Sequence, residues 1–143
     1  MKVKVVTVSP YDTITKAHKL MKTYEIRHLL VTESGELKGV ISDRDIMRVA
    51  DIDTLGVLHT PNKTVDTIMS AEPTTVDEKA TVSEVCKIML KQHIDCLPVM
   101  DGEHIKGLIT TYDLLTLLNR LADEGKCNEI AFKYNISEEG SKS

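Results

Sequence analysis

The sequence predicts a mixed α+β fold built from two tandem β-α-β-β-α repeats that share one core. The main observation is an internal duplication: residues 39–45 (GVISDRD) return as residues 107–113 (GLITTYD), and residues 28–31 (HLLV) return as residues 96–99 (CLPV). Both matches have an offset of 68 (107 − 39 and 96 − 28). The second observation is length, because 143 residues suit one ordinary domain whereas a copy of about 60 residues buries so little surface that it would be marginally stable alone.

The first repeat, residues 1–50, shows each element in order. Polar and apolar side chains alternate before Pro10, as in a half-buried strand. Thr13 is a good N-cap for a helix whose apolar residues share one face, and the turn-rich loop 33–36 joins two further strands. The expected elements are a strand at 2–8, a helix from 14 to 24, strands at 29–32 and 37–42, and a helix from 43 to about 50.

The second repeat, residues 64–122, keeps this order after a connector at 51–63. Thr81 is the equivalent N-cap, and Asp101 and Gly102 form the turn between the last two strands. The expected elements are a short lead-in helix at 64–69, a strand at 74–76, a helix from 82 to at least 89, strands at 97–100 and 105–110, and a helix from 113 to about 121.

Residues 123–143 form a C-terminal extension whose polar end is expected to be disordered. Nothing equivalent to the lead-in helix at 64–69 precedes the first repeat, so the chain could also be a fragment of a larger regulated protein.

Composition limits the classes of partner. The net charge is −4 and the pI is near 5.7, with no basic cluster suited to a nucleic-acid backbone or an anionic membrane. No apolar run approaches the roughly 20 residues of a membrane span, and the N-terminus lacks the apolar stretch of a signal peptide. We therefore expect a cytoplasmic protein with small-molecule and protein partners.

The duplicated motif Ser42-x-x-Asp45, repeated as Thr110-x-x-Asp113, has two interpretations. The simpler one is a helix cap, in which the hydroxyl accepts a hydrogen bond from a first-turn amide and the carboxylate lies near the positive helix end. The other follows from its repetition behind a glycine and two apolar residues: free amides and a hydroxyl suit a phosphate, and a carboxylate suits ribose hydroxyls. Together these groups would bind a nucleotide.

On these motifs, the chain resembles the cystathionine β-synthase (CBS) domain family over roughly residues 3–122. Residues 39–46 look especially like stand-alone bacterial CBS-pair proteins, including the acetoin-utilisation type. The resemblance implies two repeats packed through their sheets with pseudo-twofold symmetry. It also implies two clefts that bind adenosine ligands, namely AMP, ADP, ATP or S-adenosylmethionine.

The resemblance also implies which residues form each cleft. One cleft would consist of Val6, Ile26, Arg27, His28, Thr110, Tyr112 and Asp113. The other would consist of Ser42, Arg44, Asp45, Thr74, Ile94, Asp95 and Cys96.

Charge predicts that the two clefts differ in affinity. Arg27 and His28 offer donors to a phosphate, whereas the matching Asp95 and Cys96 place a negative charge there, which costs about 1 kcal/mol even in water. We therefore expect tighter binding in the Asp113 cleft. Each residue also has a structural interpretation: Arg27 as a solvated edge charge, His28 and Cys96 as packed strand ends, and Tyr112 as a cover for the helix start.

Neither a metal site nor catalysis is expected. The candidate metal ligands lack the close paired spacing of zinc sites, and no nucleophile and base are set together. The expected function is a regulatory sensor of adenosine nucleotides that needs no cofactor and acts on an unknown protein. The alternative is a ligand-free interaction module, and in either case we expect a homodimer formed through the helices at 43–50 and 113–121.

Overall fold

The computed structural model describes residues 5–126 of the chain. The first part of the strand expected at 2–8 and the tail from residue 127 onward lie outside the described residues. The chain divides into two compact units, Met1–Thr111 and Tyr112–Ser143. The first unit holds all three of the described sheets and three of the described α-helices, and the last helix belongs almost entirely to the second unit.

The first repeat has the predicted order of elements. The side chain of Thr13 accepts a hydrogen bond from the Lys16 amide and begins the first helix, as expected. The tight turn between the two central strands lies at Ser34 and Gly35, which both have positive φ and so match the right-handed twist of a hairpin. The elements are β1 (Thr7–Val8), α1 (Ile14–Tyr24), β2 (His28–Glu33), β3 (Glu36–Ser42) and α2 (Asp43–Val49).

The connector contains structure that the sequence interpretation missed. Strands β4 (Asp51–Ile52) and β5 (Leu58–His59) form an antiparallel hairpin. The short 3-10 helix η1 (Val65–Thr67) follows at the place of the expected lead-in helix. Strand β6 (Ser70–Ala71) then pairs with β3, so the first sheet has the order β1-β2-β3-β6.

The second repeat has the predicted order as well. Its sheet has the order β7-β8-β9, with β7 parallel to β8 and β8 antiparallel to β9. Helix α4, described by itself, begins two residues before the expected start and carries leucines at helical spacing. The elements are β7 (Val76–Asp77), α3 (Val82–Gln92), β8 (Cys96–Asp101), β9 (His104–Thr110) and α4 (Thr111–Asp123).

The duplication in the sequence is also a duplication of backbone geometry. His28 pairs with Ser42 and Cys96 pairs with Thr110, and both strand pairs shift register three residues further along. Helices α1 and α3 both end on a residue with left-handed φ, Glu25 at 53° and His93 at 55°. The offset of 68 therefore relates equivalent positions in the two copies.

The core of the first repeat lies between its sheet and its helices. Leu29 and Val31 on β2 point to this side and are fully buried. Val65 from η1 is also fully buried there, and Ile68 and Met69 pack against the same cluster. The remaining buried members of the cluster are Val8, Ile14, Ala17, Met21, Ile41 and Ile46.

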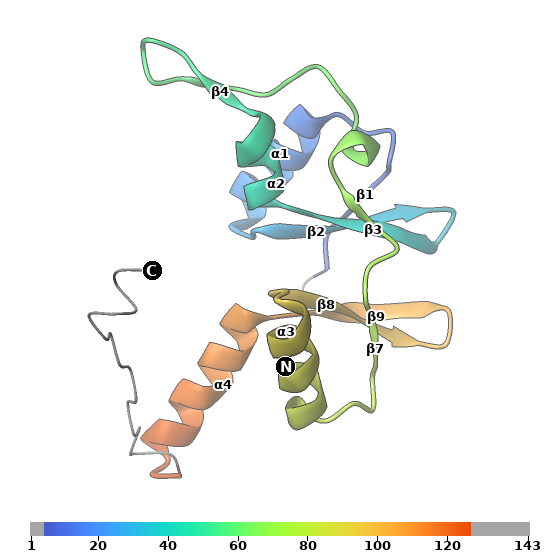
Figure 1. The fold of residues 1–143 in the computed structure, drawn as a ribbon, viewed down its shortest axis with the longest axis vertical. Helices are drawn as coiled ribbons and strands as arrows, with labels where there is room; N and C mark the ends of the chain where they lie inside the picture. The colour runs from blue at the N-terminus through green and yellow to red at the C-terminus, as the bar shows by residue number, and fades with distance from the viewer. Residues whose placement is uncertain (1–4, 127–143) are drawn as a thin grey trace, which may run out of the picture. The chain divides into compact units, whose positions relative to one another are not determined.

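The two sheets face each other, with α1 and α2 on the outer face of the first sheet and α3 on the outer face of the second (Figure 1). Leu30 and Val40 alternate with the helix-side residues and are buried on the inner face. Pro98, equivalent to Leu30, is fully buried on β8. Within the described residues, no helix has the length and hydropathy to cross a membrane. The α+β fold with sheets packed together is thus confirmed.

Candidate functional site

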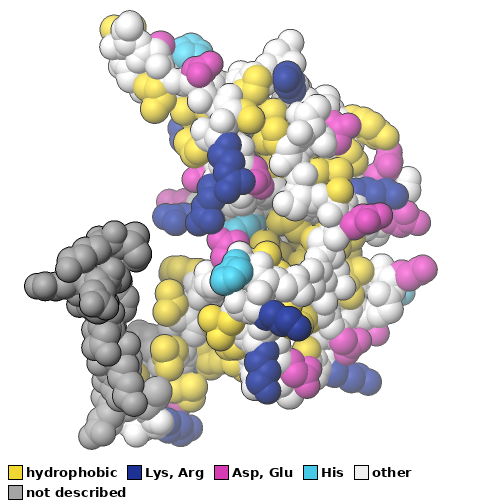
Figure 2. Space-filling view, viewed as in Figure 1, with side chains coloured by type: hydrophobic (Ala, Val, Ile, Leu, Met, Phe, Trp, Pro, Cys, Tyr) yellow, Lys and Arg dark blue, Asp and Glu magenta, His cyan; other side chains and the backbone are white. Residues whose placement is uncertain are grey.

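A cleft of about 260 Å³ lies where the two repeats meet. Basic, acidic and histidine side chains gather beside the hollow between the two layers (Figure 2). Six lining residues come from the first repeat and one from the second. They are Arg27, His28, Ser42, Asp43, Arg44, Met47 and Asp95, and we call this site the inter-repeat cleft.

The fold of the first repeat brings the start of β2 and the start of α2 together. The backbone carbonyl of Arg27 accepts a hydrogen bond of 2.8 Å from the Asp43 amide. His28 pairs with Ser42 in the β2–β3 register. The equivalent bond in the second repeat runs from the Thr111 amide to the Asp95 carbonyl at 2.9 Å. In the first repeat, the start of β2 and the start of α2 therefore form one wall of the cleft.

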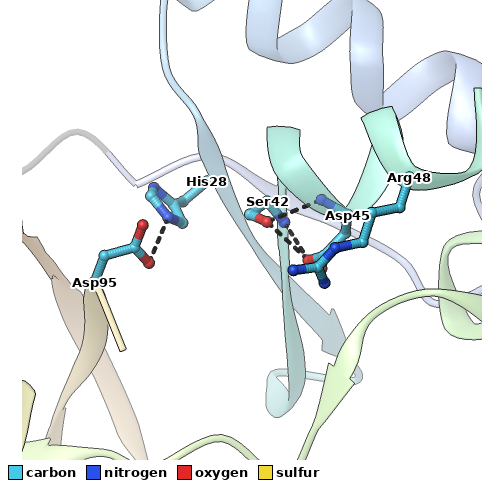
Figure 3. Close-up of polar contacts among 5 residues, drawn as sticks. All are labelled: His28, Ser42, Asp45, Arg48 and Asp95. Carbon is cyan, nitrogen blue, oxygen red and sulfur yellow. Dashed lines mark hydrogen bonds and ion pairs between the residues drawn. The ribbon is translucent and has the colours of Figure 1, made fainter. Parts of the chain in front are cut away.

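His28 makes a polar contact with the second repeat. Its Nε2 lies 3.3 Å from Oδ1 of Asp95, and the two side chains point toward each other, His28 from β2 and Asp95 from the bend just before β8 (Figure 3). The His28 side chain is only 13% exposed, whereas that of Asp95 is 46% exposed. The contact thus links a largely buried imidazole to a carboxylate that reaches solvent.

Ser42 and Asp45 form a reciprocal capping box at the start of α2 (Figure 3). The Asp45 amide donates to Ser42 Oγ at 3.1 Å, and the amide and hydroxyl of Ser42 both donate to Asp45 Oδ2 at 2.9 Å. The other carboxylate oxygen, Oδ1, lies 3.5 Å from Arg48. The helix-cap interpretation is confirmed for the first copy of the motif, and Asp45 is not one of the residues that line the inter-repeat cleft.

Cys96 lies near the carboxylates of this region. Burial raises the pKa of its thiol to about 12, and the negative charges of Asp95 and Asp45 raise it further in the same direction. A thiol with such a pKa is almost fully protonated at neutral pH, so Cys96 is not an activated nucleophile.

Other residues expected in the clefts have structural roles. Val6 and Ile26 pack against the core of the first repeat, and their backbones bond Leu30 and Met21. Thr74 donates to the side chain of Gln92 at 2.7 Å, and Ile94 is half-buried. None of these four lines the inter-repeat cleft in the described part of the chain.

Thr110 ends β9 opposite Cys96, and Tyr112 and Asp113 lie in the first turn of α4. The Tyr112 carbonyl accepts a hydrogen bond from the Thr116 hydroxyl, a contact within the helix. The grouping of Thr110, Tyr112 and Asp113 with the first repeat stays a prediction.

The structure groups the charged residues differently from the sequence interpretation. Arg27 and His28 were expected in one cleft and Asp95 in the other, yet all three line the inter-repeat cleft. Positions 28 and 96 are equivalent, so the packing of one repeat on the other brings the start of β2 close to the start of β8. The expected difference in affinity between the two clefts stays a prediction.

The sequence interpretation also missed two lining residues, Asp43 and Met47. Asp43 occupies one of the unspecified positions of the Ser42-x-x-Asp45 motif. Its position directly after Ser42 could have identified it as a lining residue. The sequence also showed no pair of histidines or cysteines at the spacing of a metal site. The fold nevertheless brings ligand atoms of His28, Asp95 and Cys96 within 4.8 Å of one another. Sequence spacing could not show this cluster because two of its members are 68 residues apart (96 − 28).

Residues 1–51 and 65–120 match the family model described as CBS domain. The CBS domain-containing protein YhcV of Bacillus subtilis is 30% identical over 124 residues, which cover 87% of this chain and 84% of that protein. Several other curated relatives are much longer enzymes, and the chain spans 21% of their length.

Two solved structures illustrate the similarity of the fold. A putative acetoin utilization protein, AcuB, from Vibrio cholerae superposes with a TM-score of 0.69 at 27% identity, over 87% of this chain and 92% of that one. The CBS domain pair of protein MJ0100, in complex with 5′-methylthioadenosine and S-adenosyl-L-methionine, gives a TM-score of 0.70 at 25% identity, over 84% of this chain and 92% of that one.

Proposed function

Because the chain belongs to the CBS domain family, whose paired domains are regulatory modules, we propose that it binds an adenosine compound where its two repeats meet. The ligand class is AMP, ADP, ATP or S-adenosylmethionine. The complex of the MJ0100 pair with two adenosine compounds supports this class. The single observation that carries the proposal is the inter-repeat cleft itself, which is lined from both repeats by ionisable side chains.

The lining residues offer complementary chemistry to a nucleotide. Arg27 and Arg44 present planar guanidinium groups, which bind phosphate oxygens through paired hydrogen bonds. Asp43 and Ser42 lie on the same wall and can bond ribose hydroxyls. The thioether of Met47 adds an adaptable apolar surface for a base.

Regulation would follow from where the ligand binds. A ligand that contacts residues of both repeats stabilises one arrangement of the two sheets over another, and only such differential affinity can transmit a signal. No catalytic step is part of the proposal. The high pKa of the Cys96 thiol supports this, since it leaves this cysteine without a reactive thiolate at neutral pH.

Self-association is a second candidate function, and exposed apolar side chains favour it. Met47 and Val49 are exposed on α2, one of the helices expected to form a homodimer. Exposed apolar side chains that lie together on one element are typical of interaction surfaces. Light scattering of the chain, compared with a Val49→Glu variant, tests this candidate: a dimeric mass that falls to the monomer in the variant is the expected result.

The sensor proposal is tested by thermal unfolding with and without each adenosine compound at millimolar concentration. A ligand at a hundred times its dissociation constant adds about 2.7 kcal/mol, which raises Tm by several degrees. The shift should be much smaller in an Arg44→Gln variant. Arg48→Gln is the matched control, because Arg48 lies on the same helix but outside the cleft.

The outcomes separate the alternatives. A shift with nucleotides that Arg44→Gln removes and Arg48→Gln keeps supports binding in the inter-repeat cleft. A shift lost only in Asp113→Ala would place the ligand at the motif of the second repeat instead. No shift with any adenosine compound would contradict the sensor proposal and leave self-association as the better account.

A further inference from the structure

We propose that His28, Asp95 and Cys96 form a binding site for a thiophilic divalent metal ion of the Zn²⁺ class, and that the bound ion joins the two repeats. The site needs no adenosine ligand and therefore goes beyond the proposed function. Its three residues come from both repeats, His28 from the first and the other two from the second.

The cluster has a clear origin in the duplicated fold. Position 28 begins β2 and position 96 begins β8, and the two positions pair in the same way with Ser42 and Thr110. When two equivalent units pack face to face, equivalent positions near the symmetry axis lie close together. Here one such position carries histidine and the other carries cysteine, which are favoured ligands of zinc.

The third ligand breaks the symmetry. Asp95 precedes Cys96, whereas the equivalent residue before His28 is Arg27. The duplicated positions thus offer one imidazole, one thiol, one carboxylate and one cation that cannot bind a metal. Three protein ligands and a remaining position for water are the arrangement of open zinc sites.

The distances suit a tetrahedral ion after a small adjustment. Zinc–nitrogen and zinc–oxygen bonds of 2.0–2.2 Å place the two ligand atoms roughly 3.4 Å apart at the tetrahedral angle. The Nε2 of His28 and the Oδ1 of Asp95 are 3.3 Å apart. All three ligand atoms lie within 4.8 Å of one another, so a movement on the order of 1 Å brings the sulfur into range.

The chemistry of the three groups balances the charge of the ion. A thiolate and a carboxylate together carry two negative charges, and the imidazole binds in its neutral form. On binding, the ion takes the place of the Cys96 proton, which is released to solvent, as happens for cysteine ligands generally. Arg27, Arg44 and Asp43 line the same cleft as His28 and Asp95, and the negative charge of Asp45 acts on Cys96. These four residues carry two charges of each sign, so together they add no net repulsion toward a cation.

Cobalt titration of the metal-free full chain tests the proposal, with no nucleotide present. Co²⁺ reports its ligands through a thiolate-to-cobalt charge-transfer absorption and through the strong visible bands of a tetrahedral ion. We expect both signals to saturate at one equivalent, Zn²⁺ to displace Co²⁺, and Zn²⁺ to raise Tm, because an ion that binds only the folded chain stabilises it.

Variants locate the site. Cys96→Ser should abolish the charge-transfer signal, and His28→Gln and Asp95→Asn should each weaken Co²⁺ binding at least ~10- to 100-fold, since even outer-shell changes have effects of this size. Cys86→Ser and Cys127→Ser are the matched controls and should retain the signal. Asp95→Asn alters a partly exposed side chain without changing its shape, so it keeps the test decisive if another variant unfolds.

Three results would overturn the proposal. One is the absence of a charge-transfer signal in the natural sequence. The second is a signal that Cys96→Ser leaves unchanged. The third is a signal that depends on Cys96 but is unaffected by both His28→Gln and Asp95→Asn, because the cysteine would then bind cobalt outside this cluster. None of these results bears on adenosine binding, which the nucleotide experiment tests separately.

Discussion

The imidazole of His28 and the carboxylate of Asp95 meet at 3.3 Å, although the residues are 67 positions apart in the sequence. His28 belongs to the first repeat and Asp95 to the second. The contact therefore depends on how the two sheets pack, and it reports on that packing.

Breaking this contact should lower the free energy of unfolding only slightly. The coupling free energy should be found for the His28–Asp95 pair and not for other pairs. In a double-mutant cycle with His28→Gln and Asp95→Asn, we expect a coupling of about 0.2–1 kcal/mol, because Asp95 is well exposed to solvent. Urea denaturation of the four proteins measures it. The control cycle pairs His28→Gln with Asp101→Asn at the far end of β8, where no coupling is expected; equal coupling in both cycles would contradict the prediction.

Removing the capping box should destabilise the chain whether or not a ligand is present. Ser42→Ala leaves the Asp45 amide without its acceptor, and Asp45→Ala removes the acceptor of the Ser42 amide. Each should lower the free energy of unfolding by about 0.5–2 kcal/mol. Chemical denaturation without ligand measures this, and Thr13→Ala, which removes the simple cap of α1, is the comparison. An unchanged midpoint for both variants would show that the capping box contributes nothing to stability.

Glycine is required at position 39 because a larger side chain would clash with its neighbours, and not because of the backbone conformation there. A Cβ there would lie 2.7 Å from the backbone oxygen of Ser70 and 2.8 Å from the Met69 sulfur. Because β6 must move to admit it, Gly39→Ala should destabilise the fold by about 1–3 kcal/mol. A Gly39→Ala, Met69→Ala double variant should regain only part of this loss, since the Ser70 oxygen remains. Full recovery in the double variant would assign the clash to the flexible side chain instead.

The β4–β5 hairpin should carry a carboxyl group with a depressed pKa. The hydrogen bond from His59 is the main cause that lowers the pKa of Asp53, and the backbone amides of Val57 and Leu55 add to it. The stabilisation from Asp53 is therefore present above its unfolded-state pKa, near 3.9, and is lost as the pH falls through the lower folded-state value. NMR titration of the carboxyl carbon measures the pKa.

His59→Gln should raise the pKa of Asp53 part of the way to its ordinary value, because the two backbone amides still donate to it. Thr60→Ser, on the neighbouring residue, serves as the control and should leave the pKa where it is. The same Asp53 pKa in the His59→Gln variant would show that the imidazole is not the cause.

Local patterns predicted most of the fold. The N-caps at Thr13, Ser42 and Thr81 depend on residues within one helical turn, and all three are present. The order of elements along each copy followed from the duplication, since each copy repeats the same alternation of apolar residues. The β4–β5 hairpin was missed because its strands have two residues each, too few to show a period, and because Asp53 shapes the loop through side-chain hydrogen bonds.

The candidate site was harder to predict because it forms between repeats. The sequence indicated Arg27, His28, Ser42, Arg44 and Asp95 as individual candidates, and the structure places all five along one cleft. Their grouping depends on the approach of the two sheets, which no local pattern encodes. The capping role of Asp45, by contrast, was open to prediction because Ser42 is three residues away.

The placement of Val65 and β6 has a consequence for how such chains evolve. Val65 is fully buried in the first core and β6 extends the first sheet, yet both lie beyond residue 63, where the second copy of the sequence begins. A gene fragment cut at the sequence boundary would encode a first copy with an incomplete core and an uncovered sheet edge. Recombination between genes would therefore preserve a foldable product when it moves the two copies together, which makes the pair, rather than the single copy, the inherited building block.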